Sequence, residues 1–194
     1  MLPLAFLFML AVIFILPFFS AEGYSMVTHT TSQLAAQHAP NAWVMNLTFI
    51  LLGTTSILDG WKRLKNYWFQ KITISIFGFA LVLTAFFQHA PIDPNLAFDM
   101  QEDHLHSLFA SITGFAFTFF AVSCAFIEPT KLRKTLAFFI GVLATLLSLL
   151  IFNMPAYAGI WQRLIFISSF AWLILFFQHR STFNISSLSS NISK

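Results

Sequence analysis

Long apolar runs, separated by short polar stretches, make up most of this chain. Each run approaches the roughly 20 residues that a helix needs to cross a hydrocarbon layer about 30 Å thick. The runs are Leu2–Ser20, Asn41–Gly60, Ile72–Gln88, His104–Ile127, Thr135–Met154 and Tyr157–Gln178. Because lipid offers no hydrogen-bond partners, each run must pair its own backbone groups as a helix. The pattern predicts an all-α fold, a polytopic membrane bundle of six transmembrane helices.

The composition narrows the class of protein further. Hydrophobic residues make up 58% of the 194 residues and charged residues only 9%, against about 25% charged in soluble domains. The net charge of +3 comes from basic residues scattered over short loops, which form no continuous groove, so we expect no nucleic-acid partner. The expected partner is the lipid bilayer, and the sequence identifies no protein partner.

Basic residues occupy every second loop between the runs. They are Lys62, Arg63, Lys65 and Lys71 after the second run, Lys131, Arg133 and Lys134 after the fourth, and Arg180 and Lys194 after the sixth. The other loops contribute only Arg163, at the start of the sixth run. Since Lys and Arg accumulate on the cytoplasmic side, we predict that both termini are cytoplasmic, in the cell membrane of a bacterium.

The ends of the chain set its domain limits. A cleaved signal peptide is the alternative for the first run, because Ser20 and Ala21 are small, but Met1–Leu10 has no basic residue. A retained helix also gives the even number of crossings that the basic loops require. We therefore predict one domain, 1–180, followed by a disordered cytoplasmic tail, 181–194, which is rich in Ser and Asn.

Small residues and the lack of charge inside the runs also bear on function. Ala110, Gly114 and Gly53 are expected to be points of close helix packing. No ionisable residue lies near the middle of a run, whereas proton-coupled and ion-coupled transporters usually carry one there. These features disfavour a transporter.

Most of the potential chemistry is gathered in two short stretches. Five of the six histidines and five of the seven carboxylates lie in residues 22–40 and 89–106, which contain no Lys or Arg. Within the second stretch, Pro91 and Pro94 exclude regular helix, so residues 92–98 are expected to be an extended connector. Asp99 and Glu102 then have the spacing of a capping pair that opens a helix. Both stretches belong to loops on the side opposite the basic ones.

The second stretch also contains a candidate metal site. On a helix that begins near Asp99, Asp103 and His106 share a face, whereas His104 points about 160° away from His106. Imidazole and carboxylate ligands suit Zn²⁺. We predict a zinc site formed by His106, Asp103, His89 and His29, and the alternative for His29 is a solvated loop histidine.

Two readings of the function follow. In the first, a bound metal ion lowers the pKa of a water molecule and generates a nucleophile, while Asp93 and Ser32 act as catalytic residues that orient the water or substrate. The protein would then be a metal-assisted hydrolase of a lipid or lipid-linked substrate at the outer leaflet. In the second reading, the chain is a non-catalytic assembly, structural or sensor protein of the membrane.

Short motifs along the chain support a family resemblance. They are Tyr24-Ser25, Ser32-Gln33-Leu34-Ala35, Pro40-Asn41-Ala42, Asn46, Gly53, Asp93 and His104-Leu105-His106-Ser107. With these motifs the chain resembles the small six-helix prokaryotic membrane proteins of domain-of-unknown-function family 998, over nearly its whole length. The resemblance implies an integral membrane protein without an assigned activity, and it points to Ser32, Asp93 and His106.

Overall fold

The computed structural model describes the backbone of residues 1–192 and the side chains of residues 1–180. Its elements are α1 (Leu2–Ile15), η1 (Leu16–Phe19), η2 (Ser32–Ala35), α2 (Ala42–Arg63), α3 (Trp68–Phe86), α4 (Met100–Ala125), α5 (Lys131–Asn153), η3 (Pro155–Tyr157) and α6 (Ala158–Ile192). Within this described part there is no strand, and six helical segments are long and apolar enough to cross a membrane. The prediction of an all-α bundle with six spanning helices is confirmed.

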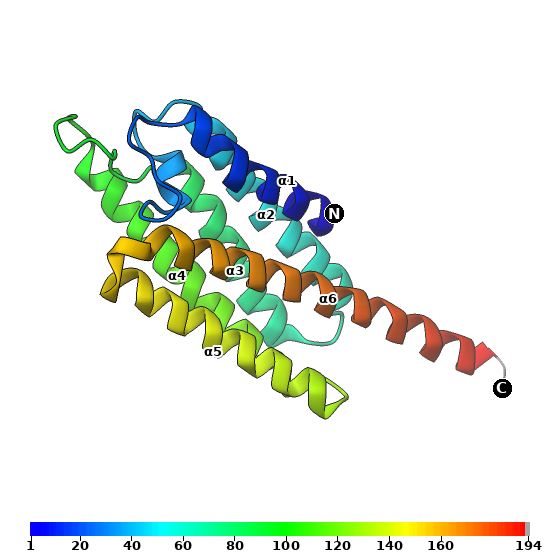
Figure 1. Cartoon of the computed structure of the whole chain (residues 1–194). Helices are drawn as coiled ribbons and strands as arrows, with labels where there is room; N and C mark the ends of the chain where they lie inside the picture. The colour runs from blue at the N-terminus through cyan, green and yellow to red at the C-terminus, as the bar shows by residue number, and fades with distance from the viewer. Residues whose placement is uncertain (193–194) are drawn as a thin grey trace.

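The helices form a closed antiparallel bundle (Figure 1). Each packs on its neighbour in the chain, and α6 also packs on α1 and α2, which closes the ring. Both termini lie at one end of the bundle (Figure 1). We call this the basic end, because its loops carry Lys62–Lys71 and Lys131–Lys134. The opposite end, formed by the α1–α2 and α3–α4 loops with the start of α4, is the histidine end. Which end faces the cytoplasm stays a prediction.

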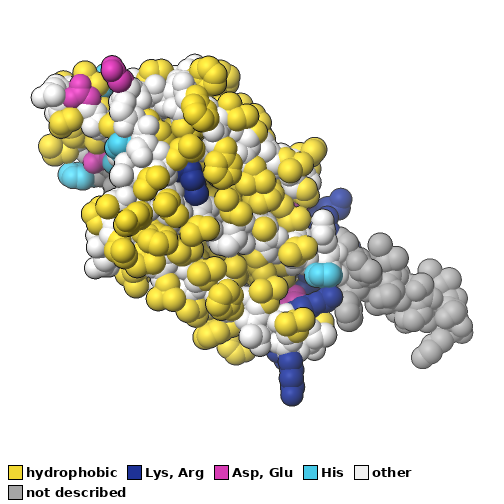
Figure 2. Space-filling model, viewed as in Figure 1, with side chains coloured by type: hydrophobic (Ala, Val, Ile, Leu, Met, Phe, Trp, Pro, Cys, Tyr) yellow, Lys and Arg dark blue, Asp and Glu magenta, His cyan; other side chains and the backbone are white. Residues whose placement is uncertain are grey.

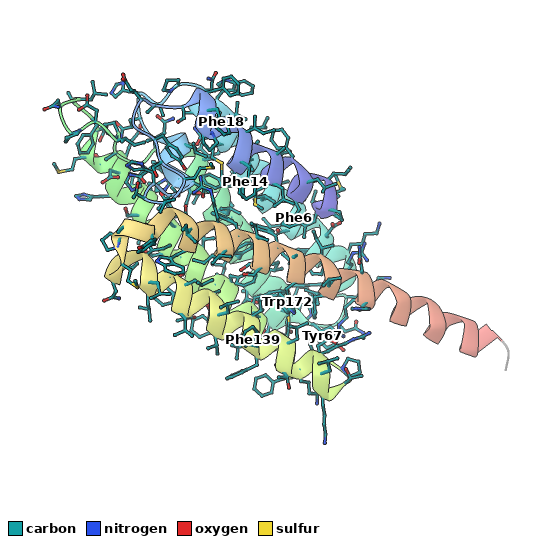
Figure 3. All side chains as sticks on the ribbon, viewed as in Figure 1. Phe6, Phe14, Phe18, Tyr67, Phe139 and Trp172 are labelled. Atoms are coloured by element: carbon teal, nitrogen blue, oxygen red, sulfur yellow. The ribbon has the colours of Figure 1, made fainter. Side chains whose placement is uncertain are left out.

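The side chains sort by position as a bilayer requires. Acidic and histidine side chains gather at the histidine end, most Lys and Arg side chains lie at the other, and hydrophobic side chains cover the surface between them (Figure 2). The interior combines aliphatic side chains with an aromatic cluster: Phe49, Phe120 and Phe170 are almost completely buried, and Trp172 packs on Phe120 and Phe176. Aromatic side chains follow the bundle along its length, from Phe6, Phe14 and Phe18 on one side to Trp172 and Phe139 on another (Figure 3).

The first apolar run is packed as a helix of the bundle. Leu2, Met9 and Ile13 of α1 are buried. The buried carboxylate of Asp59 on α2 accepts hydrogen bonds from the backbone N–H of Leu2 at 3.0 Å and from the Met1 ammonium group at 3.2 Å. This contact ties the start of α1 to the end of α2.

Two glycines allow α2 and α3 to approach each other closely, whereas the close packing expected at Gly114 of α4 is not observed. A Cβ on Gly53 would collide with the carbonyl oxygen of Gly78, and a Cβ on Gly78 with that of Gly53, so α2 and α3 touch through these residues. The expectation for Gly53 is confirmed. The expectation for Gly114 is wrong, because a Cβ there meets no atom within 4 Å.

The expected domain boundary at residue 180 stays a prediction. The backbone of α6 continues as a helix to Ile192. The expected tail, 181–194, otherwise lies outside the residues whose side chains are described, and its disorder stays a prediction.

Candidate functional site at the histidine end

His106 connects the start of α4 to the end of α3. The last carbonyl groups of a helix have no partner within it. His106 Nδ1 lies 2.8 Å from the Phe87 carbonyl oxygen and 3.2 Å from that of Thr84. Since both neighbours are acceptors, Nδ1 must be the protonated ring nitrogen. The side chain is 2% exposed, and its Nε2 is buried without a hydrogen-bond partner.

His89 lies beside His106 and is held by Asp103. Its Nδ1 is 3.1 Å from the Ala90 carbonyl oxygen and 3.4 Å from Asp103 Oδ1, so this nitrogen is also the donor. Asp103 Oδ1 also accepts the Ala90 backbone N–H at 2.7 Å. The two imidazole rings are 5.4 Å apart, with an angle of 72° between their planes. The structure therefore brings together three of the four predicted metal ligands, His106, Asp103 and His89.

When each ring is neutral, these contacts leave its Nε2 unprotonated. Metal-binding histidines usually donate their other ring N–H to a carboxylate or a backbone carbonyl, as His89 and His106 do. A Zn–N bond of about 2.1 Å would put each ring centroid about 3.2 Å from the ion, so that two rings at a tetrahedral angle would be about 5 Å apart. The centroid separation of 5.4 Å is close to that distance. Asp103 holds the His89 ring, and its predicted role as a metal ligand stays a prediction.

The start of α4 holds the α3–α4 loop by its acidic residues. Asp99 Oδ1 accepts the backbone N–H groups of Gln101 and Glu102, at 2.8 and 3.2 Å, which confirms it as the helix cap. Glu102 does not return to the Asp99 backbone as a capping pair would, and its Oε2 accepts the Gln88 N–H at 3.3 Å. The acidic cap therefore fixes the segment that carries His89.

Gln37 joins the α1–α2 loop to the same place. Its side chain donates to the carbonyl oxygens of Gln88 and Asp99 and accepts the Asp99 N–H at 2.7 Å, and its backbone N–H bonds to the His89 carbonyl oxygen at 2.9 Å. This one buried amide connects both loops of the histidine end. The sequence analysis did not single out Gln37, because an isolated Gln carries no distinctive signal.

His29 is engaged in its own loop, away from the histidine pair. Its Nδ1 accepts the Ser25 backbone N–H at 2.9 Å, and its ring packs on Tyr24. Burial lowers the pKa of His29 below its usual value, consistent with a neutral acceptor. Over the described residues, no group of three or more His, Cys, Asp or Glu side chains is arranged to hold a metal ion. His89, Asp103 and His106 are neighbours but do not form such a group, and His29 makes its described contacts within its own loop.

The two predicted catalytic residues also lie apart from the histidine pair. Ser32 is buried on η2, where its Oγ accepts from Gln162 Nε2 at 3.3 Å. Asp93 is exposed, and its Oδ1 accepts both the backbone and the side-chain N–H of Asn95 at 2.9 Å, a local turn. Neither makes a described hydrogen bond or ion pair to His89, Asp103 or His106. Their catalytic roles stay predictions.

Arg163, near the start of α6, was not expected to take part in this end. It is buried and bonds to the carbonyl oxygens of Ile13, Met26, His29 and Gly159, and it donates to the Tyr24 hydroxyl at 2.8 Å. Burial raises the pKa of Tyr24, although Arg163 acts in the opposite direction. The phenol therefore remains protonated and donates to the Thr30 carbonyl oxygen at 2.9 Å. Arg163 was detectable, since it is the one basic residue that departs from the loop pattern.

The whole chain was compared with known proteins. No curated protein and no solved structure matched it. A family model described as a protein of unknown function, DUF998, matches residues 3–179. The match covers all six spanning segments and both loops of the histidine end, so the chain belongs to the DUF998 family of membrane proteins.

Proposed function

We propose that the histidine end is the site of a metal-assisted hydrolase that acts on a lipid or lipid-linked substrate in the outer leaflet. Nε2 of His89 and Nε2 of His106 hold a zinc ion, and Asp103 fixes the orientation of the His89 ring. Water and substrate oxygens fill the remaining positions of the ion; a catalytic zinc usually has three protein ligands and one such open position, so this site would be more open than most. The ion lowers the pKa of the bound water and supplies the nucleophile at neutral pH.

One observation carries this proposal. Both rings have Nδ1 directed at an acceptor, and their centroids lie 5.4 Å apart, so the two neighbouring rings each keep Nε2 as the atom that can bind a metal ion when the ring is neutral. Ser32 and Asp93 remain the proposed residues for orienting substrate, the first through the η2 turn and the second through its exposed loop.

Metal content after purification and dialysis against zinc tests the proposal. We expect about one zinc ion per wild-type chain. His89→Ala and His106→Ala should each lose the zinc, because a single remaining protein ligand does not hold the ion. His104→Ala is the matched control, since His104 is exposed on the same helix and should keep the zinc. Equal zinc in His104→Ala and His106→Ala, or none in the wild type, contradicts the proposal.

Activity needs its own measurement. Release of headgroups from phospholipids in proteoliposomes should stop when the zinc is chelated and return when it is added back. The outer-leaflet position depends on the predicted topology. Cysteines at positions 97 and 65, in a chain with Cys124→Ser, should be labelled from outside and from the cytoplasm respectively.

A second candidate is the non-catalytic reading, favoured by the role of His106 in the packing. Its Nδ1–H bonds to two carbonyl oxygens at the end of α3, a structural function that needs no metal. His106→Asn separates the two readings, because the amide keeps a donor for those carbonyls but is a poor zinc ligand. If His106→Asn preserves both stability and the phenotype of the wild type, the non-catalytic reading stands.

A further inference from the structure

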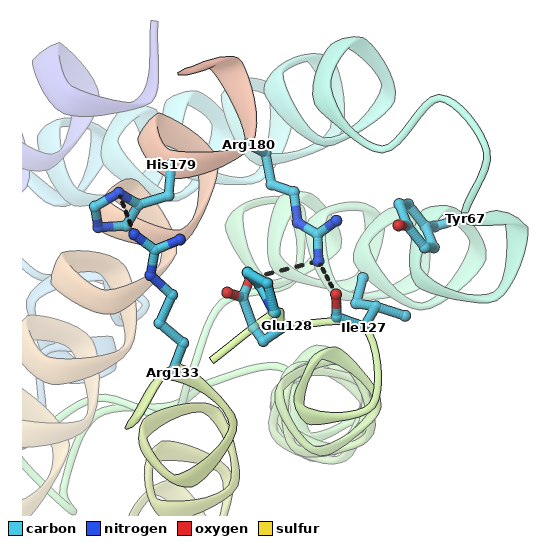
Figure 4. Close-up of a pocket in the computed structure, with 7 residues that line it drawn as sticks. Tyr67, Ile127, Glu128, Arg133, His179 and Arg180 are labelled. Atoms are coloured by element: carbon cyan, nitrogen blue, oxygen red, sulfur yellow. Dashed lines mark hydrogen bonds and ion pairs between the residues drawn. The ribbon is translucent and has the colours of Figure 1, made fainter. Parts of the chain in front are cut away.

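A cavity that contains charged side chains lies at the basic end, far from the histidine pair. Its volume is about 210 Å³. The lining residues come from the α2–α3 loop, the α4–α5 loop, the start of α5 and the second half of α6 (Figure 4): Tyr67, Ile127, Glu128, Pro129, Arg133, His179 and Arg180. It contains two guanidinium groups and one carboxylate, and the proposed hydrolase does not use any of them.

Arg180 is fixed in place on one side of the cavity. Its Nη2 donates to the Ile127 carbonyl oxygen at 2.6 Å and lies 3.5 Å from Glu128 Oε1. The guanidinium carbon lies 4.8 Å from the Tyr67 ring centroid, a cation–π contact. Arg180 is therefore a preorganised cation with one partly compensating carboxylate.

Arg133 faces the cavity from the start of α5, and its charge is not compensated. Its Nη2 lies 3.2 Å from Nδ1 of His179 (Figure 4). Since a guanidinium only donates, His179 is the acceptor, which gives Arg133 a hydrogen bond but no negative charge. Among the described residues, no carboxylate pairs with Arg133. The cavity therefore holds a net positive charge.

Glu128 adds an unsatisfied acceptor to the same cavity. It is 5% exposed, and its Oε2 is buried without a hydrogen-bond partner. A buried polar atom without a partner costs free energy and calls for an explanation. A ligand with an N–H or O–H group would supply the missing donor.

We propose that this cavity binds a phosphate ester whose headgroup also carries an amine or hydroxyl donor. The phosphate lies between Arg133 and Arg180, where guanidinium groups bind phosphate through paired hydrogen bonds. The donor bonds to Glu128 Oε2. Phe126 and Leu132, next to the lining residues in the chain, are 83% and 79% exposed. They provide the apolar surface that the acyl chains of a phospholipid require, and basic pockets between membrane helices bind lipid headgroups in this way.

The test uses the full-length chain, delipidated in detergent, with native mass spectrometry as the measure of binding. Phosphatidylethanolamine should bind to the wild type and about tenfold more weakly to Arg133→Gln, the effect of one lost charge-assisted bond. Lys131→Gln is the matched control, because Lys131 is an exposed cation two residues away that does not line the cavity. It should bind as the wild type does.

Further ligands test each part of the headgroup. Phosphatidylcholine, which has no N–H donor, should bind more weakly than phosphatidylethanolamine, and this difference should shrink in Glu128→Gln. Diacylglycerol, which has no phosphate, should not bind. Soluble phosphoethanolamine identifies the source: weak competition indicates a lipid, whereas full displacement at a similar concentration indicates a soluble phosphate ester.

Three results would overturn the assignment. They are equal losses in Lys131→Gln and Arg133→Gln, binding of diacylglycerol as tight as that of phosphatidylethanolamine, and no binding of either phosphate-bearing ligand to the wild type. The last two use the unaltered chain, so they stand even if a variant does not fold.

Discussion

The two ends of the bundle both bury polar side chains, but they differ in how many main-chain groups one side chain serves. At the histidine end Arg163 reaches four carbonyl oxygens, and Gln37 joins both loops. At the basic end Arg63, Lys71 and Arg180 each bond to one carbonyl oxygen, and carboxylates meet positive groups, as Asp59 meets the Met1 ammonium group and Glu128 meets Arg180.

The difference follows from loop length. The α1–α2 loop runs from the end of η1 to Asn41 with only the short η2 turn, so it buries many backbone groups that no regular element pairs. Such groups must find partners, and an Arg with five donors or a Gln with both kinds of group is suited to supply them. The loops of the basic end are short and leave few such groups. We therefore expect single substitutions to be costly at the histidine end and mild at the basic end.

The largest effect should come from Arg163→Leu. The change removes one donor from each of four carbonyl oxygens and from the Tyr24 hydroxyl; the His29 carbonyl oxygen keeps a second donor, the Tyr24 hydroxyl at 3.2 Å. Because orphaned buried acceptors cost about 1–3 kcal/mol each and water will reach some of them, we expect a loss of about 3–5 kcal/mol. Thermal unfolding in detergent measures it.

The matched control for Arg163→Leu is Arg133→Leu, at the other end. Arg133 bonds only to His179 among its described partners, so its replacement should change stability by less than about 1 kcal/mol in delipidated protein. Equal losses in the two variants would remove the contrast between the ends.

A smaller effect is expected from Gly159→Ala, which tests how tightly the first loop rests on α6. A Cβ there would collide with the carbonyl oxygens of Met26 and His29, and Arg163 Nη1 lies 3.0 Å away. Forcing these groups apart should cost about 1–3 kcal/mol. Gly114→Ala on α4 is the control, since open space surrounds that position, and it should be neutral or slightly stabilising. A silent Gly159→Ala would mean that the loop moves aside freely.

The spans were predictable because lipid imposes length and apolarity on every crossing helix. The same simple rule does not say which helix faces touch, so Gly114 was expected to pack and Gly78 was not singled out, although Gly78 meets Gly53. Close contact depends on the rotation of each helix, which small residues alone do not encode.

The positions of the site residues were predictable only where the spacing of residues on a helix determines which side chains meet. Asp103 and His106 share a helix face, and His89 comes just after α3, so their convergence followed from local geometry. His29, Ser32 and Asp93 lie in loops, whose course depends on long-range contacts such as that of Gln162 with Ser32. Distance along the chain does not determine such contacts, and these residues do not join the cluster.

The smallest expected effect is a pH dependence of the stability of the histidine end, which arises from the titration of His29. Burial lowers the pKa of His29, so as the pH falls below about 6.5 the unfolded chain takes up a proton before the folded chain does. The stability is therefore full above that pH and falls until the lower, folded-state pKa is passed. Protonation also removes the lone pair that accepts the Ser25 N–H. The ring is only partly buried, so the loss should stay below about 1 kcal/mol.

His29→Asn isolates this effect. The amide oxygen of Asn lies near the position of Nδ1 and can accept the Ser25 N–H, but it does not titrate in this range. Thermal unfolding of both chains between pH 7.5 and pH 5 should show a shallower pH dependence in the variant. Because both chains keep the other five histidines, the difference between the two curves belongs to His29. If the curves are parallel, the proton does not enter at His29, and the acid sensitivity of this end lies in another group.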